Sequence, residues 1–257
     1  MTGGFARSAL RLLRRRVIDE VLFRVNPDFE SQDIETMRYA GPYTLTSIYR
    51  LHALIQAVKY LDRSKIAGDV VECGVWKGGS MMAVARTLQN LGDSGRSLYL
   101  FDTFSGMTEP TGPDVSVTGT PAARRFERTR HTSDDGSEWC NAPLVEVRQA
   151  MQSTGYPFEK IVLVEGKVES TIPDNAPERI ALLRLDTDWY ESTRHELIHL
   201  YPRLVEGGVL IIDDYGHWMG ARKAVDTYFA EHGVQMLLNR IDYTCRIGVK
   251  TTRAADR

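Results

Sequence analysis

The sequence contains few cysteines, and their positions do not suggest pairing. Cys73, Cys140 and Cys245 are the three cysteines among 257 residues, and no two of them form a C-x-x-C pair. An odd and widely spread set argues against a disulfide framework and against a zinc site. We therefore expect a protein of a reducing compartment, the cytoplasm.

Long apolar runs and a large net charge are also absent. No apolar stretch approaches the ~20 residues that a membrane-spanning helix needs, and the N-terminus lacks the apolar segment of a secretory signal. The 32 basic and 34 acidic side chains nearly cancel, leaving a formal charge of -2, and no basic and aromatic pattern of a nucleic-acid module occurs. We expect a soluble protein with no nucleic-acid partner and no membrane span.

The length and composition fit one α/β domain with appendages. A chain of 257 residues that is 42% hydrophobic can bury one substantial core. We expect an N-terminal helical extension and lid at residues 1–62 and a core at residues 63–257. Residues 106–141, rich in Ser, Thr, Pro, Gly and charge, form an unusually long connection, which is typically a lid, a binding loop or disorder. We interpret them as a lid insertion.

The N-terminal part predicts two helices separated by a loop. Residues 5–25 alternate arginines with apolar residues, which indicates an amphipathic helix that either docks on the protein or makes peripheral contact with a membrane surface. Residues 26–42 contain two prolines and a glycine and predict a loop, and residues 44–61 have helical apolar spacing. Three tyrosines in this region either pack or line an acceptor pocket: Tyr39, Tyr43 and Tyr49.

Residues 69–80 predict a buried strand, a glycine-rich turn and the start of a helix at 81–88. Gly74, Gly78 and Gly79 allow a ligand to approach the backbone, and the new helix offers unpaired N–H groups. Their spacing is not the G-x-G-x-x-G of dinucleotide sites. Glu72 precedes the turn and would repel pyrophosphate, but it complements the sulfonium and ammonium groups of S-adenosylmethionine. A structural turn with an incidental acid is the alternative.

Two further predicted strands add to the expected nucleoside site. Residues 97–102 predict a strand that ends in Asp102, where α/β nucleoside-binding folds place the carboxylate that accepts ribose hydroxyls. An exposed aspartate at a strand end is the alternative interpretation. Residues 161–165 predict a third strand, and the turn after it, at 166–168, is expected to border the adenine.

Pairs of carboxylates follow the next two predicted strands. Asp186 and Asp188 come after residues 180–185, and Asp213 and Asp214 come after residues 208–212. In a parallel sheet these four acids would meet at the carboxyl edge, where their mutual repulsion requires a cation. Oxygen ligands favour Mg²⁺, Mn²⁺ or Ca²⁺ over zinc. The alternative is a set of solvent-facing helix caps. Helices are expected at 191–204 and 221–232, and an antiparallel strand pair at 234–238 and 244–249.

Together these motifs resemble the macrocin O-methyltransferase (TylF-type) family. The resemblance covers roughly residues 44–249 and is carried by the segments TLTSIYRL (44–51), ECGVWKGG (72–79), FDTFSG (101–106), LDTDWY (185–190) and DDY (213–215). It implies a class I methyltransferase fold, an α/β Rossmann-like three-layer sandwich with a mostly parallel seven-stranded sheet, N-terminal helices and a lid insertion. It also implies that S-adenosylmethionine and Mg²⁺ serve to methylate a sugar hydroxyl of a glycosylated natural product or glycan, and that the protein is a homo-oligomer.

The resemblance assigns roles to individual residues. The implied cofactor-binding residues are Thr44, Leu45, Glu72, Gly74, Gly79, Ser80, Asp102, Thr103, Gly166, Lys167, Val168 and Asp186. The implied metal ligands are Asp186, Asp213 and Asp214, and the implied catalytic residues are Asp186 and Asp188, with Asp188 as the base. If Asp188 is not the base, we expect His217 to take that role. Thr187 stands where the family often has glycine, and the 106–141 segment differs from the antibiotic enzymes, so the acceptor stays open.

Three other functions are alternatives to sugar methylation. A metal-dependent methyltransferase of a catechol or other phenol needs the same carboxylates. A non-catalytic binding protein could keep the fold but has no need of all four acids. A dehydrogenase disagrees with the glycine spacing.

Overall fold

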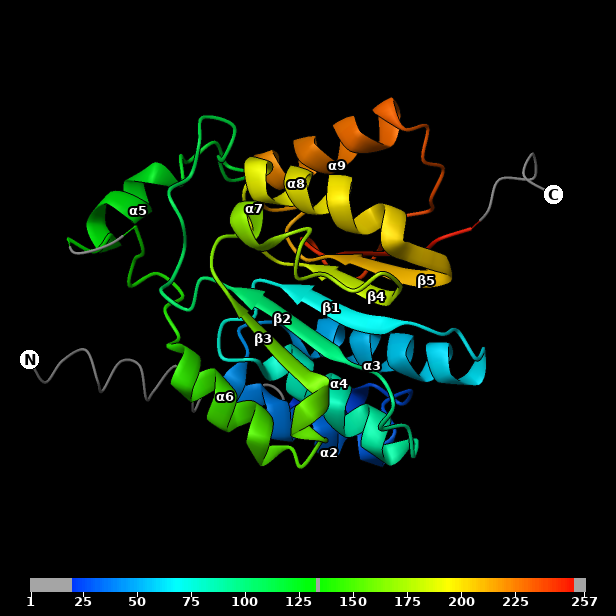
Figure 1. Cartoon of the computed structure of the whole chain (residues 1–257). Coiled ribbons are helices and arrows are strands. Elements are labelled where there is room, and N and C mark those ends of the chain that lie inside the picture. The colour runs from blue at the N-terminus through cyan, green and yellow to red at the C-terminus, as the bar shows by residue number, and fades with distance from the viewer. Residues whose placement is uncertain (1–19, 133–134, 252–257) are drawn as a thin grey trace, which may run out of the picture.

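A seven-stranded sheet lies at the centre of the protein, with helices on both faces (Figure 1). The computed structural model describes residues 20–132 and 135–251. The strand order is β3-β2-β1-β4-β5-β7-β6, and only the pairs that involve β7 are antiparallel. The expected Rossmann-like α/β fold with a mostly parallel sheet is confirmed. The strands are β1 (Asp69–Cys73), β2 (Leu98–Asp102), β3 (Ile161–Glu165), β4 (Ile180–Leu185), β5 (Leu204–Ile212), β6 (Asn239–Arg240) and β7 (Arg246–Val249).

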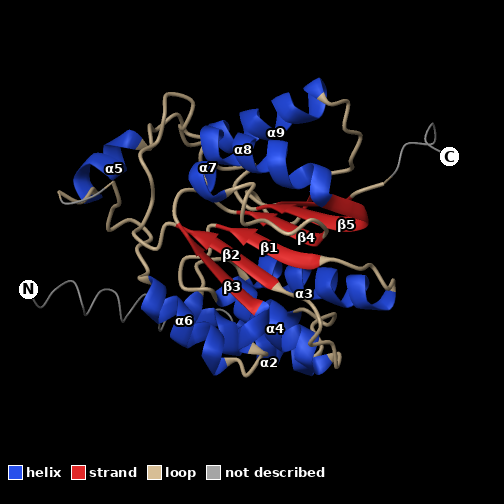
Figure 2. Ribbon diagram, in the orientation of Figure 1, coloured by secondary structure: helices blue, strands red, loops and turns tan. Residues whose placement is uncertain are grey.

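The helices form the two outer layers of the sandwich (Figure 2). One layer contains α2 (Ser31–Ala40), α3 (Ile48–Arg63), α4 (Gly79–Asn90) and α6 (Leu144–Ser153). The other contains α7 (Val168–Thr171), α8 (Tyr190–Leu200) and α9 (Met219–Glu231), and α5 (Ala123–Thr129) lies apart, in the 106–141 segment that the sequence predicts as a lid. Short 3-10 turns complete the list: η1 (Gly41–Tyr43), η2 (Phe158–Lys160) and η3 (Tyr201–Arg203). Within the described ranges, none of these helices combines the length and the apolar character needed to cross a membrane.

Both faces of the sheet are buried, so its central strands are apolar throughout. Successive residues of a strand point to opposite faces. Val70 and Leu182 accordingly join the core under α3 and α4, whereas Val71 and Leu183 join the core under α8 and α9. All four are at most 1% exposed. This explains the continuous apolar runs in the sequence, which are typical of parallel strands covered on both sides.

The parallel register brings the ends of four strands to one edge. Cys73 at the end of β1 pairs with Phe101 of β2 and with Leu185 of β4, and Leu185 pairs with Ile212 of β5. The segments after these strands therefore emerge side by side. They contain the glycine-rich turn, Asp102 and the two acid pairs, as the sequence predicts.

The prediction of a loop at 26–42 is wrong, because α2 occupies Ser31–Ala40. This helix is mostly polar, and its contacts with the rest of the protein are partly ionic. Asp33 is 2% exposed and accepts from Lys59 at 2.6 Å. The predicted helix at 5–25 lies largely outside the described residues, and residues 20–25 are helical.

Two other boundaries differ from the sequence-based expectation. Helix α3 begins at Ile48 rather than at residue 44, because the Ser47 hydroxyl accepts from the N–H of Arg50 and caps the helix. Residues 44–47 consequently precede the helix, and Thr44, Leu45 and Thr46 line the pocket described below. The 106–141 segment also contains a helix, α5, that the sequence did not predict.

The C-terminal part departs most from the prediction. Residues 234–238 form no strand, and the short β6 at Asn239–Arg240 pairs with β7 instead. Val234, Met236 and Leu238 still pack against the core while Leu237 is 85% exposed. Alternate side chains of this segment are thus partly buried, but within the described part of the chain the segment pairs with no strand. Helix α8 ends at Leu200 rather than at 204, and Pro202 lies in the following 3-10 turn.

Candidate active site at the carboxyl edge of the sheet

The glycine-rich turn touches the first acid-bearing turn. Gly74 has a φ of +81°, and a Cβ placed on it would lie 2.1 Å from the carbonyl oxygen of Asp186. Only glycine fits such an approach of two backbones. Gly78, with a φ of +82°, ends the turn and precedes α4. The sequence therefore places the β1 turn and the β4 turn in direct contact.

Asp102 holds the loops around it through their backbone. Its Oδ2 accepts from the N–H groups of Val75 at 2.8 Å and Trp76 at 3.0 Å, and its Oδ1 accepts from Phe104 N–H at 2.8 Å. Burial raises the pKa of this carboxyl, while the three N–H donors act in the opposite direction. Each carboxylate oxygen has two lone pairs. Two N–H groups occupy those of Oδ2, so Oδ1 can accept at most one further hydrogen bond from the predicted ribose.

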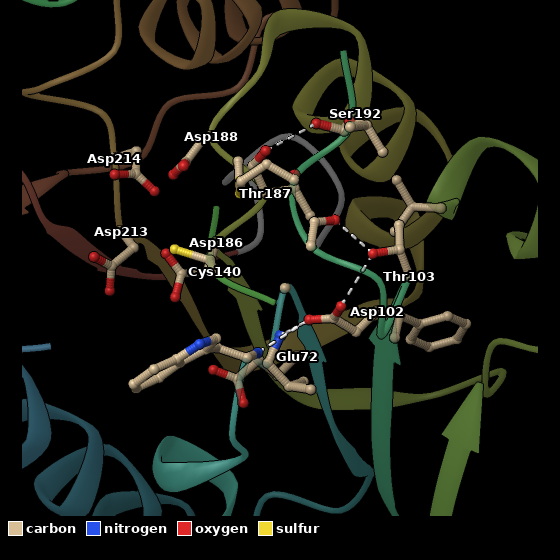
Figure 3. Close-up of a pocket in the computed structure, with 18 of the residues that line it drawn as sticks. Glu72, Asp102, Thr103, Cys140, Asp186, Thr187, Asp188, Ser192, Asp213 and Asp214 are labelled. Carbon is tan, nitrogen blue, oxygen red and sulfur yellow. Dashed lines mark hydrogen bonds between the residues drawn. The ribbon is translucent and has the colours of Figure 1, made fainter. Parts of the chain in front are cut away.

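A pocket of about 240 Å³ lies over these turns (Figure 3). The predicted site residues that line it are Thr44, Leu45, Glu72, Gly74, Ser80, Asp102, Thr103, Gly166, Lys167, Val168, Asp186, Asp188, Asp213 and Asp214. The two predicted residues that do not line it are Gly79 and His217. The lid insertion contributes Gly106, Met107, Thr108 and Cys140 to the lining, which the sequence predicted only as a segment.

Gly79 lies beneath the segment that covers the pocket. A Cβ on Gly79 would be 2.6 Å from the carbonyl group of Tyr43 and 2.7 Å from Thr44. Glycine is needed there because residues 43 and 44 cross over it. Tyr43 and Tyr39 pack against the core instead of lining the pocket.

Glu72 is buried at the base of the pocket, and one of its oxygens is paired. The carboxylate is 1% exposed, and Oε1 accepts from Arg184 of β4. Its Oε2 is buried and makes no hydrogen bond of normal geometry among the residues described, although the nearby Ser80 hydroxyl helps to lower the pKa of this carboxyl. A buried oxygen without a donor is energetically costly. An ammonium group bound in the pocket would satisfy it.

Three carboxylates converge at the other end of the pocket. One oxygen each of Asp186, Asp188 and Asp214 lies within 4.8 Å of the others, a grouping that can hold a cation. Figure 3 shows Asp188 and Asp214 facing each other there. Asp214 Oδ2 is buried without a hydrogen-bond partner among the described residues. The acids thus form a hard-oxygen donor set with an unsatisfied atom, which fits Mg²⁺ or Mn²⁺.

Without a cation these acids resist ionisation. Burial raises the pKa of Asp188 to about 7, although a hydrogen bond with Asp214 acts in the opposite direction. Burial also raises the pKa of Asp186, which Arg184 opposes, and burial together with the Asp188 charge raises that of Asp214. Such clustering of raised pKa values is typical of functional sites.

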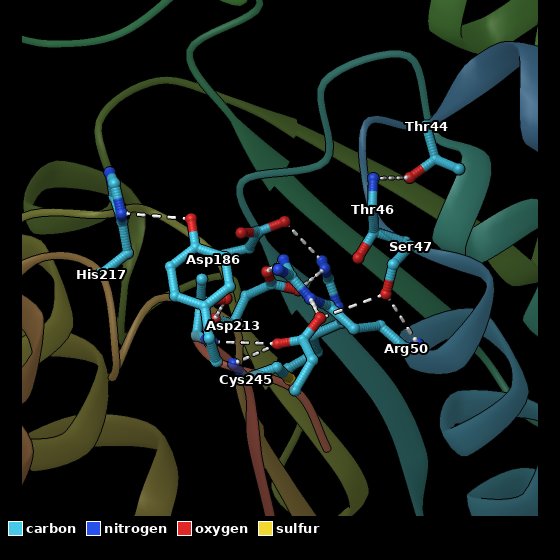
Figure 4. A network of polar contacts seen from close by, with 12 residues as sticks. Thr44, Thr46, Ser47, Arg50, Asp186, Asp213, His217 and Cys245 are labelled. Carbon is cyan, nitrogen blue, oxygen red and sulfur yellow. Dashed lines mark hydrogen bonds and ion pairs between the residues drawn. The ribbon is translucent and has the colours of Figure 1, made fainter. Parts of the chain in front are cut away.

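Asp213, which the family resemblance implies as a metal ligand, pairs with two arginines in this structure. Its carboxylate is 3% exposed and forms ion pairs with Arg50 of α3 and Arg184 of β4. Arg50 also donates to Asp242 at 2.7 Å, and Ser47 donates to the same Asp242 oxygen at 3.2 Å (Figure 4). In this structure Asp188, rather than Asp213, completes the carboxylate group with Asp186 and Asp214.

His217 lies outside the pocket lining. Its Nδ1 is 3.3 Å from the Tyr243 hydroxyl (Figure 4). Its ring packs edge-on against Trp218. Burial and the Arg50 charge lower the pKa of this imidazole. The fallback base therefore lies outside the group of carboxylates, three residues after Asp214, whereas Asp188 belongs to that group.

Sequence reasoning missed the two arginines that neutralise the site. Arg184 is 3% exposed and pairs with Glu72, Asp186 and Asp213, the second of these at 2.6 Å. A charged residue in the otherwise apolar run 180–185 was a usable signal, since buried charges are normally paired. Arg50 has no comparable signal, because arginines are common on exposed helix faces.

This sheet order, with the pocket at the carboxyl edge, defines a class I methyltransferase fold. The solved structure of the O-methyltransferase NovP has a TM-score of 0.72 at 26% identity, covering 95% of this chain and all of that one. The calicheamicin methyltransferase CalS11, at 17% identity, shares the fold with a TM-score of 0.63 over 97% of this chain and 93% of that one.

The sequence comparisons identify the family. The profile of the macrocin-O-methyltransferase (TylF) family matches residues 21–248. A tetracenomycin rhamnosyl 4'-O-methyltransferase of Streptomyces olivaceus is 32% identical over 79% of this chain and 73% of its own length. The mycinamicin III 3''-O-methyltransferase of Micromonospora griseorubida is 30% identical over 88% of this chain and 87% of its own length. The chain belongs to the macrocin O-methyltransferase family and is an O-methyltransferase, as the sequence motifs predicted.

Proposed function

We propose that this enzyme transfers the methyl group of S-adenosylmethionine to a sugar hydroxyl of a glycosylated natural product, with a divalent cation at the acid cluster. The observation that carries the proposal is that one pocket contains two buried carboxylate oxygens that make no hydrogen bond of normal geometry with the described residues, one at each end. Glu72 Oε2 lies at the cofactor end, and Asp214 Oδ2 lies at the acid end. The sugar-modifying relatives support the acceptor class.

The residues of the pocket divide between holding the donor and orienting the acceptor. Glu72 would accept from the ammonium group of S-adenosylmethionine, and Asp102 with residues 166–168 would border its nucleoside. Thr44 and Leu45 would cover it, and the side chain of Leu45 is exposed, at 62%, where it could do so. This arrangement would hold the acceptor oxygen in line with the methyl group, about 3–3.5 Å from it.

Proton transfer falls to Asp188 in this proposal. The acceptor oxygen forms a bond to the methyl carbon as the carbon–sulfur bond breaks, and the hydroxyl proton passes to the Asp188 carboxylate, leaving S-adenosylhomocysteine. A pKa of about 7 makes Asp188 a better base than an ordinary aspartate. Asp186, Asp214 and one oxygen of Asp188 would hold the cation, and the other Asp188 oxygen would take the proton. When bound, such an ion supplies Lewis-acid stabilisation of negative charge on the acceptor oxygen and fixes its direction.

Two binding measurements test the donor and cation sites separately. Isothermal titration calorimetry should show binding of S-adenosylhomocysteine and none of NAD. Electron paramagnetic resonance should show one bound Mn²⁺ that Asp214→Asn removes. The matched control is Asp226→Asn, because Asp226 is a half-exposed carboxylate of α9. Binding of NAD in place of the methyl donor would overturn the proposal.

Acceptor profiling tests the substrate class. A panel of rhamnosides and other natural-product glycosides is compared with catechols, with and without EDTA. Methylation of glycosides that stops with EDTA is the expected result. Methylation of catechols alone would favour the phenol alternative, and tight cofactor binding without turnover on either class would favour a non-catalytic protein. Homo-oligomerisation and membrane-surface contact by the N-terminal helix stay predictions.

A further inference from the structure

We propose that Asp114 of the lid insertion is a positioning residue that holds Asp188 in place by fixing the start of α8. This inference rests on the role of Asp188 in the proposed function. Asp114 does not line the pocket and would touch neither substrate nor cofactor. Its effect is transmitted through the backbone of the two residues that follow Asp188.

Asp188 lies in an unusually tight turn. Its φ is +69°, and the N–H of Trp189 donates to the carbonyl of Thr187 at 2.8 Å. This is a γ-turn with a positive central φ, a rare and strained conformation, and aspartate must adopt it here without the freedom of glycine. Such a turn persists only where the surrounding structure determines it. The contacts on both sides of Asp188 therefore decide where its carboxylate points.

Asp114 supplies one of these contacts from a distant part of the chain. It is 1% exposed, and its Oδ1 accepts from the N–H of Tyr190, the first residue of α8, at 2.8 Å. Helix α8 has no cap of its own, because Trp189 occupies the N-cap position and its side chain makes no capping bond. A carboxylate at this place satisfies an N–H group that the helix leaves unpaired. The lid thus provides the cap that the local sequence lacks.

The Asp114 carboxylate is itself fixed on its other sides. Its Oδ2 accepts from the N–H and the hydroxyl of Thr111, at 2.6 and 2.9 Å. A Cβ placed on Gly220 of α9 would lie 1.9 Å from Asp114 Oδ1, so the side chain is held against that helix with no room to move. The contact with Tyr190 is therefore rigid.

A second lid contact secures the residue between Asp188 and Tyr190. The Trp189 indole donates to the carbonyl of Thr108 at 3.1 Å. Its ring is 3% exposed and packs between Trp139 and Trp218, with centroids 5.5 and 5.0 Å away. Two consecutive residues after Asp188 are consequently held by the lid insertion. On the other side, the Thr187 hydroxyl donates to Glu196 of α8 at 2.9 Å.

Mn²⁺ affinity reports on the position of Asp188, because its carboxylate belongs to the group that can hold a cation. Asp114→Ala should weaken Mn²⁺ binding about tenfold or more, the usual effect of removing a residue that orients a metal ligand. S-adenosylhomocysteine affinity should change less than about twofold. The Mn²⁺ affinity of Asp114→Asn should lie between that of Asp114→Ala and that of the wild type, since the amide oxygen of asparagine can still accept from the N–H of Tyr190. The control is Glu127→Gln, an exposed carboxylate on the lid helix α5.

A double-mutant cycle separates positioning from a general loss of stability. If Asp114 acts through Asp188, adding Asp114→Ala to Asp188→Asn should weaken Mn²⁺ binding no further. Additive losses would overturn the proposal, as would wild-type Mn²⁺ affinity in Asp114→Ala.

Hydrogen exchange provides a readout that does not depend on metal binding. In the full chain without metal, Asp114→Ala should speed exchange of residues 186–190 about tenfold and leave β1 unchanged. Unchanged exchange at 186–190 would also overturn the proposal. Absence of Mn²⁺ binding by the wild-type protein would count against the proposed function, while the exchange result would still test Asp114.

Discussion

Arg184 and Glu72 form an ion pair in the interior of the sheet, where their side chains are 4% and 1% exposed. They are directly opposite each other in the β1–β4 ladder. The same guanidinium also pairs with Asp186 and Asp213. One cation thus compensates the acid at the cofactor end of the pocket and two acids at its other end.

Removing Arg184 should destabilise the fold strongly. Arg184→Met leaves buried carboxylates without their cation, and breaking a buried pair in this way costs about 3–5 kcal/mol. Urea denaturation at neutral pH measures the loss in the free energy of unfolding. The control is Arg38→Met, which removes an exposed pair with Glu20 and should cost less than about 1 kcal/mol. Equal losses in the free energy of unfolding for the two variants would show that the buried ion pairs of Arg184 stabilise the fold no more than an exposed pair does.

Ionisation of Glu72 should reduce stability as the pH rises. Burial raises the pKa of Glu72 from 4.5 to about 7, although Arg184 lowers it. Because the folded-state pKa is above the unfolded one, the stabilising contribution is complete below about pH 4.5 and is lost as the pH rises through 7. The difference between the unfolded-state and folded-state pKa values corresponds to a loss of roughly 3 kcal/mol in the free energy of unfolding.

Glu72→Gln isolates this contribution, because glutamine stays neutral at every pH. The free energy of unfolding of the variant minus that of the wild type should increase by up to about 3 kcal/mol from pH 5 to pH 8.5, because only the wild type loses stability as Glu72 ionises. The measurement is urea denaturation with EDTA at both pH values. A difference between the two proteins that does not vary with pH would contradict the raised pKa.

The predictions from sequence succeeded where the signal is local. Apolar runs and glycine spacing predicted β1, the turn after it and α4, and the acids at the strand ends were correctly placed at one edge. Helix α2 was missed because its stability depends on a distant partner, Lys59, which pairs with buried Asp33. The segment 234–238 forms no strand, because a strand also needs a neighbouring strand to pair with, and the local sequence does not show whether one is present.

The polar contacts inside the site could not be predicted in the same way. Arg184 faces Glu72 only because β4 lies beside β1 in this register, and a shift of one residue would place it on the other face. The pairing of Asp213 with Arg50 depends in addition on how α3 packs over the sheet. The difference between the predicted metal triad and the observed carboxylate group follows from these two tertiary contacts.

A methyl group at Gly74 should disrupt the site more than one at Gly92. Both glycines have positive φ, +81° and +74°, so alanine strains the backbone at each by about 1–2 kcal/mol. At Gly74 the new Cβ would also meet the Asp186 carbonyl at 2.1 Å, whereas nothing lies within 4 Å at Gly92. Gly74→Ala should therefore abolish S-adenosylhomocysteine binding in calorimetry, and Gly92→Ala should retain it. Wild-type affinity in Gly74→Ala would mean that the two turns can separate without loss.

The choice between Asp188 and Asp213 as the third cation ligand can be decided by comparing their asparagine variants. Asp188→Asn removes a member of the carboxylate group within 4.8 Å and should weaken Mn²⁺ binding about tenfold or more. Asp213→Asn removes a carboxylate that already pairs with Arg50 and Arg184, so it should lower the free energy of unfolding more than it lowers Mn²⁺ affinity. Because a ligand must be deprotonated and the pKa of Asp188 is about 7, wild-type Mn²⁺ affinity should fall below pH 7. The opposite ranking of the two variants would show that the arginines release Asp213 when a cation binds, and would restore the triad predicted from the sequence.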